Sequence, residues 1–250
     1  MLQLKNEQEI AKILKASQIL VEVLQACEDL AEPGITTGEL DYFVKNSIIR
    51  RGAKPAFLGY MNYPASLCIS INNEVIHGIP GRRKLQEGDI VGLDVGIELD
   101  GYFSDTAITI GVGRISVERA RLLKVTEQCL EKAIKQAIAG NRVSDISRTV
   151  YDHARANNYD VVRQYCGHGV GFSQHEDPQV PNYLSTGPNP RLRPGMVIAI
   201  EPMINQGGWQ VEVLKDDWTV VTADGLDSAH FEHTIAIFKD RTEILTSFKR

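Results

Sequence analysis

Apolar residues return every three or four positions between residues 10 and 30, the period of a helix with one buried face. Asn6 and Glu9 match a capping box, so this helix is predicted to begin after Asn6. Short apolar runs at 66–71 and 89–95 predict buried strands, and the later part of the chain alternates strands with long loops. The same reasoning predicts three further helices, at 37–50, 117–139 and 144–157.

Two parts of the chain resemble each other at a nearly constant spacing. The segment LQEGDIVGLD, which ends at Asp94, matches LRPGMVIAIE, which ends at Glu201. A weaker match, between AEPGITTGEL and AIAGNRVSDI, could arise from similar helix caps alone. The stronger match aligns two carboxylates, so it predicts a single domain over 1–250 with pseudo-two-fold symmetry and halves of about 1–113 and 114–250.

Five residues of types that bind metals lie in short apolar or glycine-bounded segments: Asp94, Asp105, His168, Glu201 and Glu232. A buried carboxylate is costly unless it is paired or binds a metal, and two of these carboxylates end apolar runs. Four carboxylates and one imidazole suit two divalent ions with mixed oxygen and nitrogen ligands. Each residue alone has an ordinary alternative as a turn, edge or salt-bridge residue, but the five together predict a dinuclear metal site.

The pair Asp100-Gly101 predicts a two-residue hairpin turn between the first two of these carboxylates. With this turn Gly96 pairs with Asp105, and Asp94 lies two residues from Gly96 on the same face. The two carboxylates would then be diagonal neighbours, roughly 7–8 Å apart at Cα. A turn one residue longer would reverse the orientation, so this prediction depends on the register.

Two histidines besides His168 are candidates for contact with a substrate. His168 stands between glycines, which permit close approach of the backbone, and His175 follows in the same segment. His77, in VIHGIPG, is expected beside the metals, where its imidazole could hydrogen-bond a substrate. The alternative for His77 is a histidine whose hydrogen bonds are satisfied by its own loop.

Composition narrows the range of functions. The 250 residues carry 27 basic and 32 acidic side chains, and the net charge of −5 without a basic run argues against a nucleic-acid partner. Four widely spaced cysteines without a CxxC pair, and no signal-like or membrane-spanning apolar run, predict reduced thiols in a cytoplasmic protein. The motifs GxSxG, GxxxxGK[ST] and HExxH do not occur in the sequence.

Nine segments together resemble the bacterial type I methionine aminopeptidases: ITTGELD, CISINNEVIHGIPG, EGDIVGLDVG, YFSDTA, YCGHGVG, HEDPQVPNY, PGMVIAIEPM, DDWTVVT and HFEHTIAIF. The similarity runs over nearly the whole chain with matching spacing. It implies an α+β pita-bread fold, in which two related α/β halves enclose a dinuclear metal site. It also implies removal of the N-terminal methionine from nascent proteins and peptides, with a preference for a small second residue.

The resemblance further implies roles for single residues. The five ligands would hold two divalent ions per chain (Co, Mn, Fe or Zn), and a hydroxide bridging the ions would be the nucleophile. Glu201 would also carry a proton to the leaving amine, His175 would stabilise the carbonyl oxygen, and His77 would hold the substrate amide. Asn72 and Ser228 align with positions that help to hold a monovalent cation, with ordinary turn residues as the alternative.

The methionine pocket implied by the resemblance combines Tyr60, Tyr63, Cys68 and Trp218 with the two substrate histidines, His77 and His175. Rings and a thiol suit an unbranched thioether, although each residue could equally be plain core. Phe57 stands where the family commonly has cysteine, and Gln174 stands where Phe or Leu is usual. Gln174 should therefore interrupt the apolar rim, with Phe172 as a candidate replacement, and Gln174→Phe should raise methionine specificity or lower KM.

Other functions of the same fold fit the sequence less well. A proline dipeptidase or an aminopeptidase acting before proline carries a large N-terminal domain, whereas 6 residues precede the first predicted helix. A type II methionine aminopeptidase carries a helical insert in its second half, where 32 residues separate His168 from Glu201. A non-catalytic pita-bread binding protein loses metal ligands and is often basic. The expected partners are nascent N-termini and, by way of the domain surface, the ribosome, and the expected state is a monomer.

Overall fold

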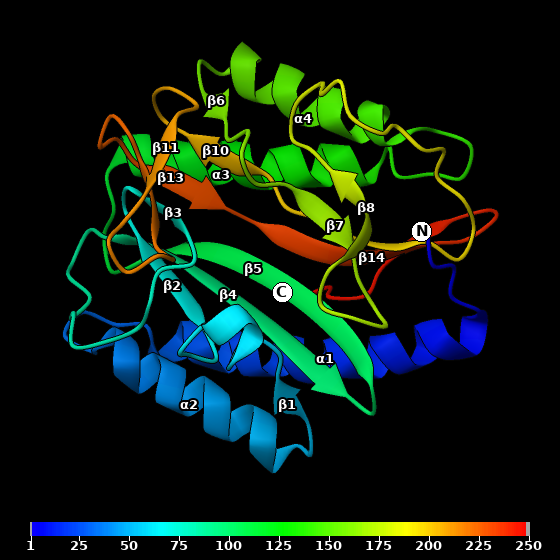
Figure 1. The fold of residues 1–250 in the computed structure, drawn as a ribbon. Coiled ribbons are helices and arrows are strands. Elements are labelled where there is room, and N and C mark those ends of the chain that lie inside the picture. The colour runs from blue at the N-terminus through cyan, green and yellow to red at the C-terminus, as the bar shows by residue number, and fades with distance from the viewer. Residues whose placement is uncertain (1, 249–250) are drawn as a thin grey trace.

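The computed structural model describes residues 2–248 as a curved central sheet with two pairs of helices (Figure 1). In Figure 1 the pair α1–α2 runs below the sheet and the pair α3–α4 runs above it. The helices are α1 (Glu7–Leu30), α2 (Thr37–Arg50), α3 (Val117–Ile134) and α4 (Val143–Ala156), with a short 3-10 helix, η1 (Tyr60–Asn62). Within residues 2–248, none of the helices is long and apolar enough to cross a membrane.

The central sheet has nine strands, and all of its pairs are antiparallel. Its main path runs β1 (Lys54–Pro55), β4 (Ile90–Leu99), β5 (Tyr102–Gly111), β14 (Glu232–Ile237), β9 (Val197–Ile200), β7 (Gly167–Gly169) and β8 (Glu176–Val180), with β2 (Cys68–Ile71) on β4 and β15 (Thr242–Ile244) on β14. Two small sheets flank it: β13 (Ser228–His230), β10 (Met203–Asn205) and β6 (Asp160–Val161); and β11 (Val211–Val213), β12 (Val220–Thr222) and β3 (Glu74–Ile76).

The helix starts follow the local capping signals. Asn6 with Glu9 caps α1, and Thr36 with Glu39 caps α2, both as reciprocal capping boxes. The predicted end of the third helix at 139 is wrong, because α3 stops at Ile134. From there to residue 138 the chain forms tighter turns, which let Gly140 donate its N–H to the Leu192 carbonyl.

That bond at Gly140 has a counterpart earlier in the chain, which supports the internal repeat. The N–H of Gly34 donates to the Leu85 carbonyl at 2.8 Å, and the N–H of Gly140 donates to the Leu192 carbonyl at 2.9 Å. These are the same donors and acceptors that the two sequence matches align. Both glycines have φ near +100°, a conformation that side chains rarely adopt. The boundaries of the two halves stay a prediction, which superposition of the halves would test.

The β4–β5 hairpin has the register that the Asp100-Gly101 turn predicts. Asp100 and Gly101 both have positive φ, as a type I′ turn requires. Gly96 pairs with Asp105, and Asp94 pairs with Ala107, so the two carboxylates are diagonal neighbours on one face. The other face of β4 is part of the largest hydrophobic core, against which α1 packs.

Candidate metal centre and substrate pocket

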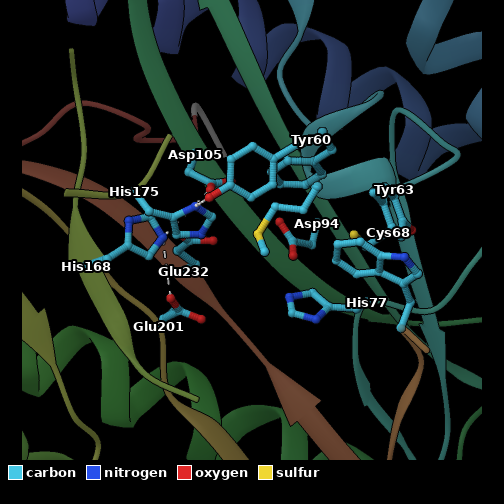
Figure 2. A pocket seen from close by; sticks show the side chains of 13 residues that line it. Tyr60, Tyr63, Cys68, His77, Asp94, Asp105, His168, His175, Glu201 and Glu232 are labelled. Carbon is cyan, nitrogen blue, oxygen red and sulfur yellow. Dashed lines mark hydrogen bonds and ion pairs between the residues drawn. The ribbon is translucent and has the colours of Figure 1, made fainter. Parts of the chain in front are cut away.

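The five predicted ligands meet at one end of a cavity because they stand on neighbouring strands of the central sheet (Figure 2). They are Asp94 in β4, Asp105 in β5, Glu232 at the start of β14, Glu201 directly after β9 and His168 in β7. The cavity has a volume of about 280 Å³, and all five side chains line it. The pairing of these strands therefore brings residues that are far apart in the sequence together at one site.

His168 shows how the backbone prepares a ligand. Its Nδ1 lies 2.9 Å from the carbonyl oxygen of Gly169, an acceptor, so this nitrogen carries the ring proton. The free lone pair is then on Nε2, which lies 3.6 Å from Glu201 Oε1 and 3.9 Å from Asp105 Oδ2. Ligand atoms of Asp105, His168 and Glu232 all lie within 4.8 Å of one another, a spacing at which they can share an ion.

The carboxylates of this cluster need a cation. Among the described residues, Asp94 Oδ1, Asp105 Oδ1 and Glu232 Oε1 are buried without a hydrogen-bond partner. Burial and the neighbouring negative charges raise the pKa of Asp105 and Glu232 well above the usual range, and burial raises the pKa of Asp94 to about 7. Unpartnered buried oxygens together with one imidazole fit divalent metal ions.

Two hydroxyl groups fix the spacing of β5 and β14 at the site. The Thr234 hydroxyl donates to the backbone carbonyl of Asp105 at 2.7 Å and accepts the Asp105 N–H at 3.1 Å. The Thr106 hydroxyl donates to the backbone carbonyl of Glu232 at 2.7 Å. The backbones of two ligands are thereby held together without using any carboxylate oxygen.

Two buried residues contact the ligands and were not found as such from the sequence. Gln174 donates its Nε2 to Asp105 Oδ2, and its side chain is 3% exposed. His230, also 3% exposed, places Nε2 at 3.5 Å from Glu201 Oε2. His230 stands two residues before Glu232, so strand alternation was the signal that could have placed it on the site's side.

The two histidines that are expected to contact a substrate, His77 and His175, both line the cavity. His77 packs edge-on against Trp218 and Tyr165, with ring centroids 6.0 and 5.6 Å away. His175 lies next to His168, with ring centroids 4.2 Å apart, and its Nδ1 is 2.9 Å from the Tyr60 hydroxyl (Figure 2). Burial lowers the pKa of both His77 and His175 to about 4, so both rings are neutral at pH 7.

The predicted pocket residues Tyr60, Tyr63, Cys68 and Trp218 line the same cavity. Tyr63 and Trp218 meet edge to face at 5.0 Å, and the Tyr63 hydroxyl donates to the Gly78 carbonyl at 2.9 Å, so its hydrogen-bonding capacity is satisfied by the backbone. Cys68 pairs with Asp94 across β2 and β4, which places the predicted pocket directly beside the predicted metal ligands. All four cysteines of the chain are free thiols, as expected.

The expectation for the pocket rim is wrong at both positions named for it. Gln174 does not line the cavity, because its side chain is buried behind Asp105. Phe172 does not replace it, because its ring packs against Tyr102 at 6.0 Å and under the Lys5 ammonium at 5.1 Å. Phe57 lines the cavity instead.

Asn72 and Ser228, the two residues aligned with a monovalent-cation site, are adjacent. The Ser228 N–H donates to the Asn72 carbonyl at 2.9 Å. The Asn72 side chain is occupied on both sides, since it donates to Asp89 and accepts the N–H of Ile90. The cation itself stays a prediction.

Comparison with known proteins relates nearly the whole chain to one family of enzymes. A model of metallopeptidase family M24 matches residues 11–239. A methionine aminopeptidase of Clostridium perfringens is 50% identical over 100% of both chains, and methionine aminopeptidase 1 of Bacillus subtilis is 46% identical over 97% of this chain and 98% of its own.

Solved structures agree with the sequence relatives. Methionine aminopeptidases from Rickettsia prowazekii and Thermotoga maritima both superpose with a TM-score of 0.96, at 39% and 42% identity, over 99% of this chain and 100% of theirs. A prolidase from Pyrococcus horikoshii matches with a TM-score of 0.80 at 26% identity and is covered over 64% of its length. The chain thus has the pita-bread fold and belongs to metallopeptidase family M24, within which it is a type I methionine aminopeptidase.

Proposed function

We propose that the cavity removes the N-terminal methionine from nascent polypeptides and peptides with the five ligands Asp94, Asp105, His168, Glu201 and Glu232 and two divalent ions. The observation that carries this proposal is the shared cavity. Buried carboxylates with unpartnered oxygens lie at one end of the cavity, and an apolar pocket formed by aromatic rings and the Cys68 thiol lies beside them. A methionine side chain in the pocket would place the first peptide bond of a substrate at the metal ligands.

The reaction divides between the ions and the surrounding side chains. Divalent ions held here would supply a water of lowered pKa as the nucleophile and neutralise developing negative charge. The Glu201 carboxylate, with Oε1 towards His168 and Oε2 towards His230, accepts a proton and passes it to the leaving amine.

The histidines act on the peptide bond itself. We take the Tyr60 hydroxyl as the donor of its 2.9 Å bond with His175 Nδ1, so the neutral ring keeps its proton at Nε2 and donates it towards the carbonyl oxygen as that oxygen gains charge. His77, at the other side of the cavity and neutral, hydrogen-bonds the substrate amide. These roles make His77, His175 and Glu201 the catalytic residues of the proposal.

The remaining expectations extend the proposal. The donor set accommodates Mn, Fe, Co or Zn, and availability decides among them as much as affinity does. A small second residue in the substrate, the ribosome as a docking partner, the monomeric state and a cytoplasmic location are all parts of this proposal. The four free thiols are consistent with the last of these.

The decisive experiment is N-terminal release from three peptides after metal replacement. The protein is stripped with a chelator, reloaded with Mn or Co, and offered Met-Ala-Ser, Leu-Ala-Ser and Ala-Pro-Ser. Release of methionine alone, dependent on metal, is expected. Release of alanine from the proline peptide would favour a proline-directed enzyme. A metal-loaded protein that releases nothing would favour a binding protein of the same fold.

A further inference from the structure

Phe57 and Gln174, the two positions that depart from the family pattern, meet over one glycine. A Cβ atom on Gly96 would lie 2.7 Å from Phe57 Cε1 and 2.9 Å from Gln174 Nε2, so any larger residue at 96 would displace one of them. Gly96 is in β4 opposite Asp105, and its carbonyl accepts the N–H of Ala56 at 2.9 Å, next to Phe57. The space above this glycine is therefore filled jointly by a ring and an amide.

The side-chain amide of Gln174 hydrogen-bonds a predicted metal ligand and does not line the pocket. Its Nε2 donates to Asp105 Oδ2, and the side chain is buried away from the cavity. That bond leaves Asp105 Oδ1 as the unpartnered oxygen of the carboxylate. A donor behind a ligand oxygen fixes the orientation of the carboxylate before an ion arrives, which is how outer residues tune metal sites.

The ring of Phe57 provides an apolar wall of the pocket. Phe57 is 9% exposed, lines the cavity, and forms a small hydrophobic cluster with Tyr63, Ala65 and Cys68, with Trp218 packed against it. In this chain the ring comes from the loop after β1.

We propose that Phe57 is a specificity-determining residue and Gln174 a positioning residue for Asp105, and that the two form a compensating pair across Gly96. Phe57 supplies the apolar wall that position 174 no longer provides, and position 174 is thereby free to hold a metal ligand. Two rings cannot share the space above Gly96. Gln174→Phe in this chain should therefore harm both the pocket and the metal site, the reverse of what the sequence alone predicts.

The test compares Phe57→Cys, Gln174→Phe, the double variant and Gln174→Met, using two readouts. Calorimetric titration of the metal-free proteins with Mn reports on Asp105, and the KM for Met-Ala-Ser with excess Mn reports on the pocket. Phe57→Cys should raise KM about tenfold and leave Mn affinity unchanged, because it removes one ring from a largely buried site. Gln174→Met, which keeps the length and removes the amide, should weaken Mn binding about tenfold or more.

The double variant carries the decisive result. Gln174→Phe alone should weaken Mn binding and raise KM, whereas Phe57→Cys with Gln174→Phe should return KM to within about threefold of the parent and leave Mn binding weak, since contacting residues are non-additive. The matched control is Gln179→Met on β8, an exposed glutamine that should not affect Mn binding. Circular dichroism confirms folding, and if Gln174→Phe does not fold, Phe57→Cys and Gln174→Met decide the two roles separately.

Three outcomes would overturn the inference: Mn affinity unchanged in Gln174→Met, KM unchanged in Phe57→Cys, or additive KM effects in the double variant. The pocket half of this inference rests on the proposed function, and the metal half does not. A parent protein that releases no methionine would defeat the proposed function, and the Mn titrations would still decide the role of Gln174. Calorimetric binding of L-methionine to the Mn-loaded proteins would then replace KM as the readout for Phe57.

Discussion

Burial decides the protonation state of single residues around the cavity. His77 and His175 both have a pKa lowered to about 4, because the surroundings disfavour the charged ring. A neutral ring at His175 can accept from Tyr60 on one side and donate on the other, which a charged ring cannot do. Tyr60 therefore has two expected roles: its ring lines the pocket, and its hydroxyl orients the His175 ring.

Tyr60→Phe tests that role. The change removes one hydroxyl and leaves the ring in the pocket, so the loss of orientation at His175 should lower kcat by about fivefold and change KM little, since one such bond contributes about 1 kcal/mol. Steady-state kinetics with Met-Ala-Ser measures both constants. Tyr42→Phe on the exposed face of α2 is the control, and an unchanged kcat in Tyr60→Phe would remove the tyrosine from the mechanism.

His77 should make the metal-free protein sensitive to acid. Its pKa rises from about 4 in the folded chain to 6.5 when unfolded, so the unfolded chain binds the proton first and stability falls as pH drops through this range. Between pH 7 and pH 5 this residue alone should lower the free energy of unfolding by about 2 kcal/mol. In His77→Asn, chosen because asparagine tolerates the positive φ at this position, that part of the pH dependence should vanish in urea titrations. An identical pH dependence in both proteins would contradict a desolvated, neutral His77.

Among the elements, the segment before α1 holds the loop that carries Gln174 and His175. The Lys5 ammonium pairs with the Glu176 carboxylate, and both side chains are 1% exposed. The other carboxylate oxygen accepts the N–H groups of Phe172 and Ser173, and the Lys5 N–H donates to the Gly195 carbonyl at 2.7 Å. These contacts connect the N-terminal segment to the loop and to the start of β8, next to the predicted metal ligands.

Lys5→Met should lower the free energy of unfolding by about 3 kcal/mol, because removing one member of a buried ion pair leaves the other charge without its partner. Lys54→Met is the matched control, since Lys54 is 73% exposed in its pair with Glu98 and should change the same quantity by less than about 1 kcal/mol. Urea unfolding of the metal-free proteins measures both. If the two variants lowered the free energy of unfolding equally, the buried Lys5–Glu176 pair would contribute no more to stability than the exposed Lys54–Glu98 pair.

For the whole molecule, the metal centre couples stability to both metal and pH. In the metal-free chain the raised pKa values of Asp94, Asp105 and Glu232 mean that the folded state binds protons more readily than the unfolded state. Their contribution to stability is therefore present at low pH and is lost as pH rises through the folded-state pKa, about 7 for Asp94. Bound divalent ions replace those protons.

Metal should accordingly raise Tm, and more strongly at pH 8 than at pH 6. At a hundredfold excess over Kd, one site adds about 2.7 kcal/mol to the free energy of unfolding, and protons compete less at the higher pH. Thermal scans of the chelator-treated protein with and without Mn at the two pH values make the measurement. Asp94→Asn should reduce the metal-dependent gain, and a gain that is larger at pH 6 than at pH 8 would contradict the assignment of the carboxylates.

The sequence by itself determined the features that depend on neighbours within a few residues. The capping boxes at Asn6 and Thr36, and the Asp100-Gly101 turn with its register, form as expected because each is settled by hydrogen bonds within one short segment. The sequence also predicted the five residues that line one end of the cavity as metal ligands, since a carboxylate that ends a buried apolar run needs a cation or a hydrogen-bond partner. These local signals, with the family resemblance, sufficed to identify the fold and the reaction.

Only the tertiary structure decided which residues contact and support the predicted metal ligands from outside the cavity. Gln174 and Asp105 are distant in the sequence, as are Lys5 and Glu176, and α3 ends early so that Gly140 can reach the Leu192 carbonyl. No local pattern reports such contacts, because they depend on how the strands of the central sheet bring distant segments together. The direction of the Gln174 side chain, towards a ligand and away from the pocket, follows from the space above Gly96 that Phe57 already fills.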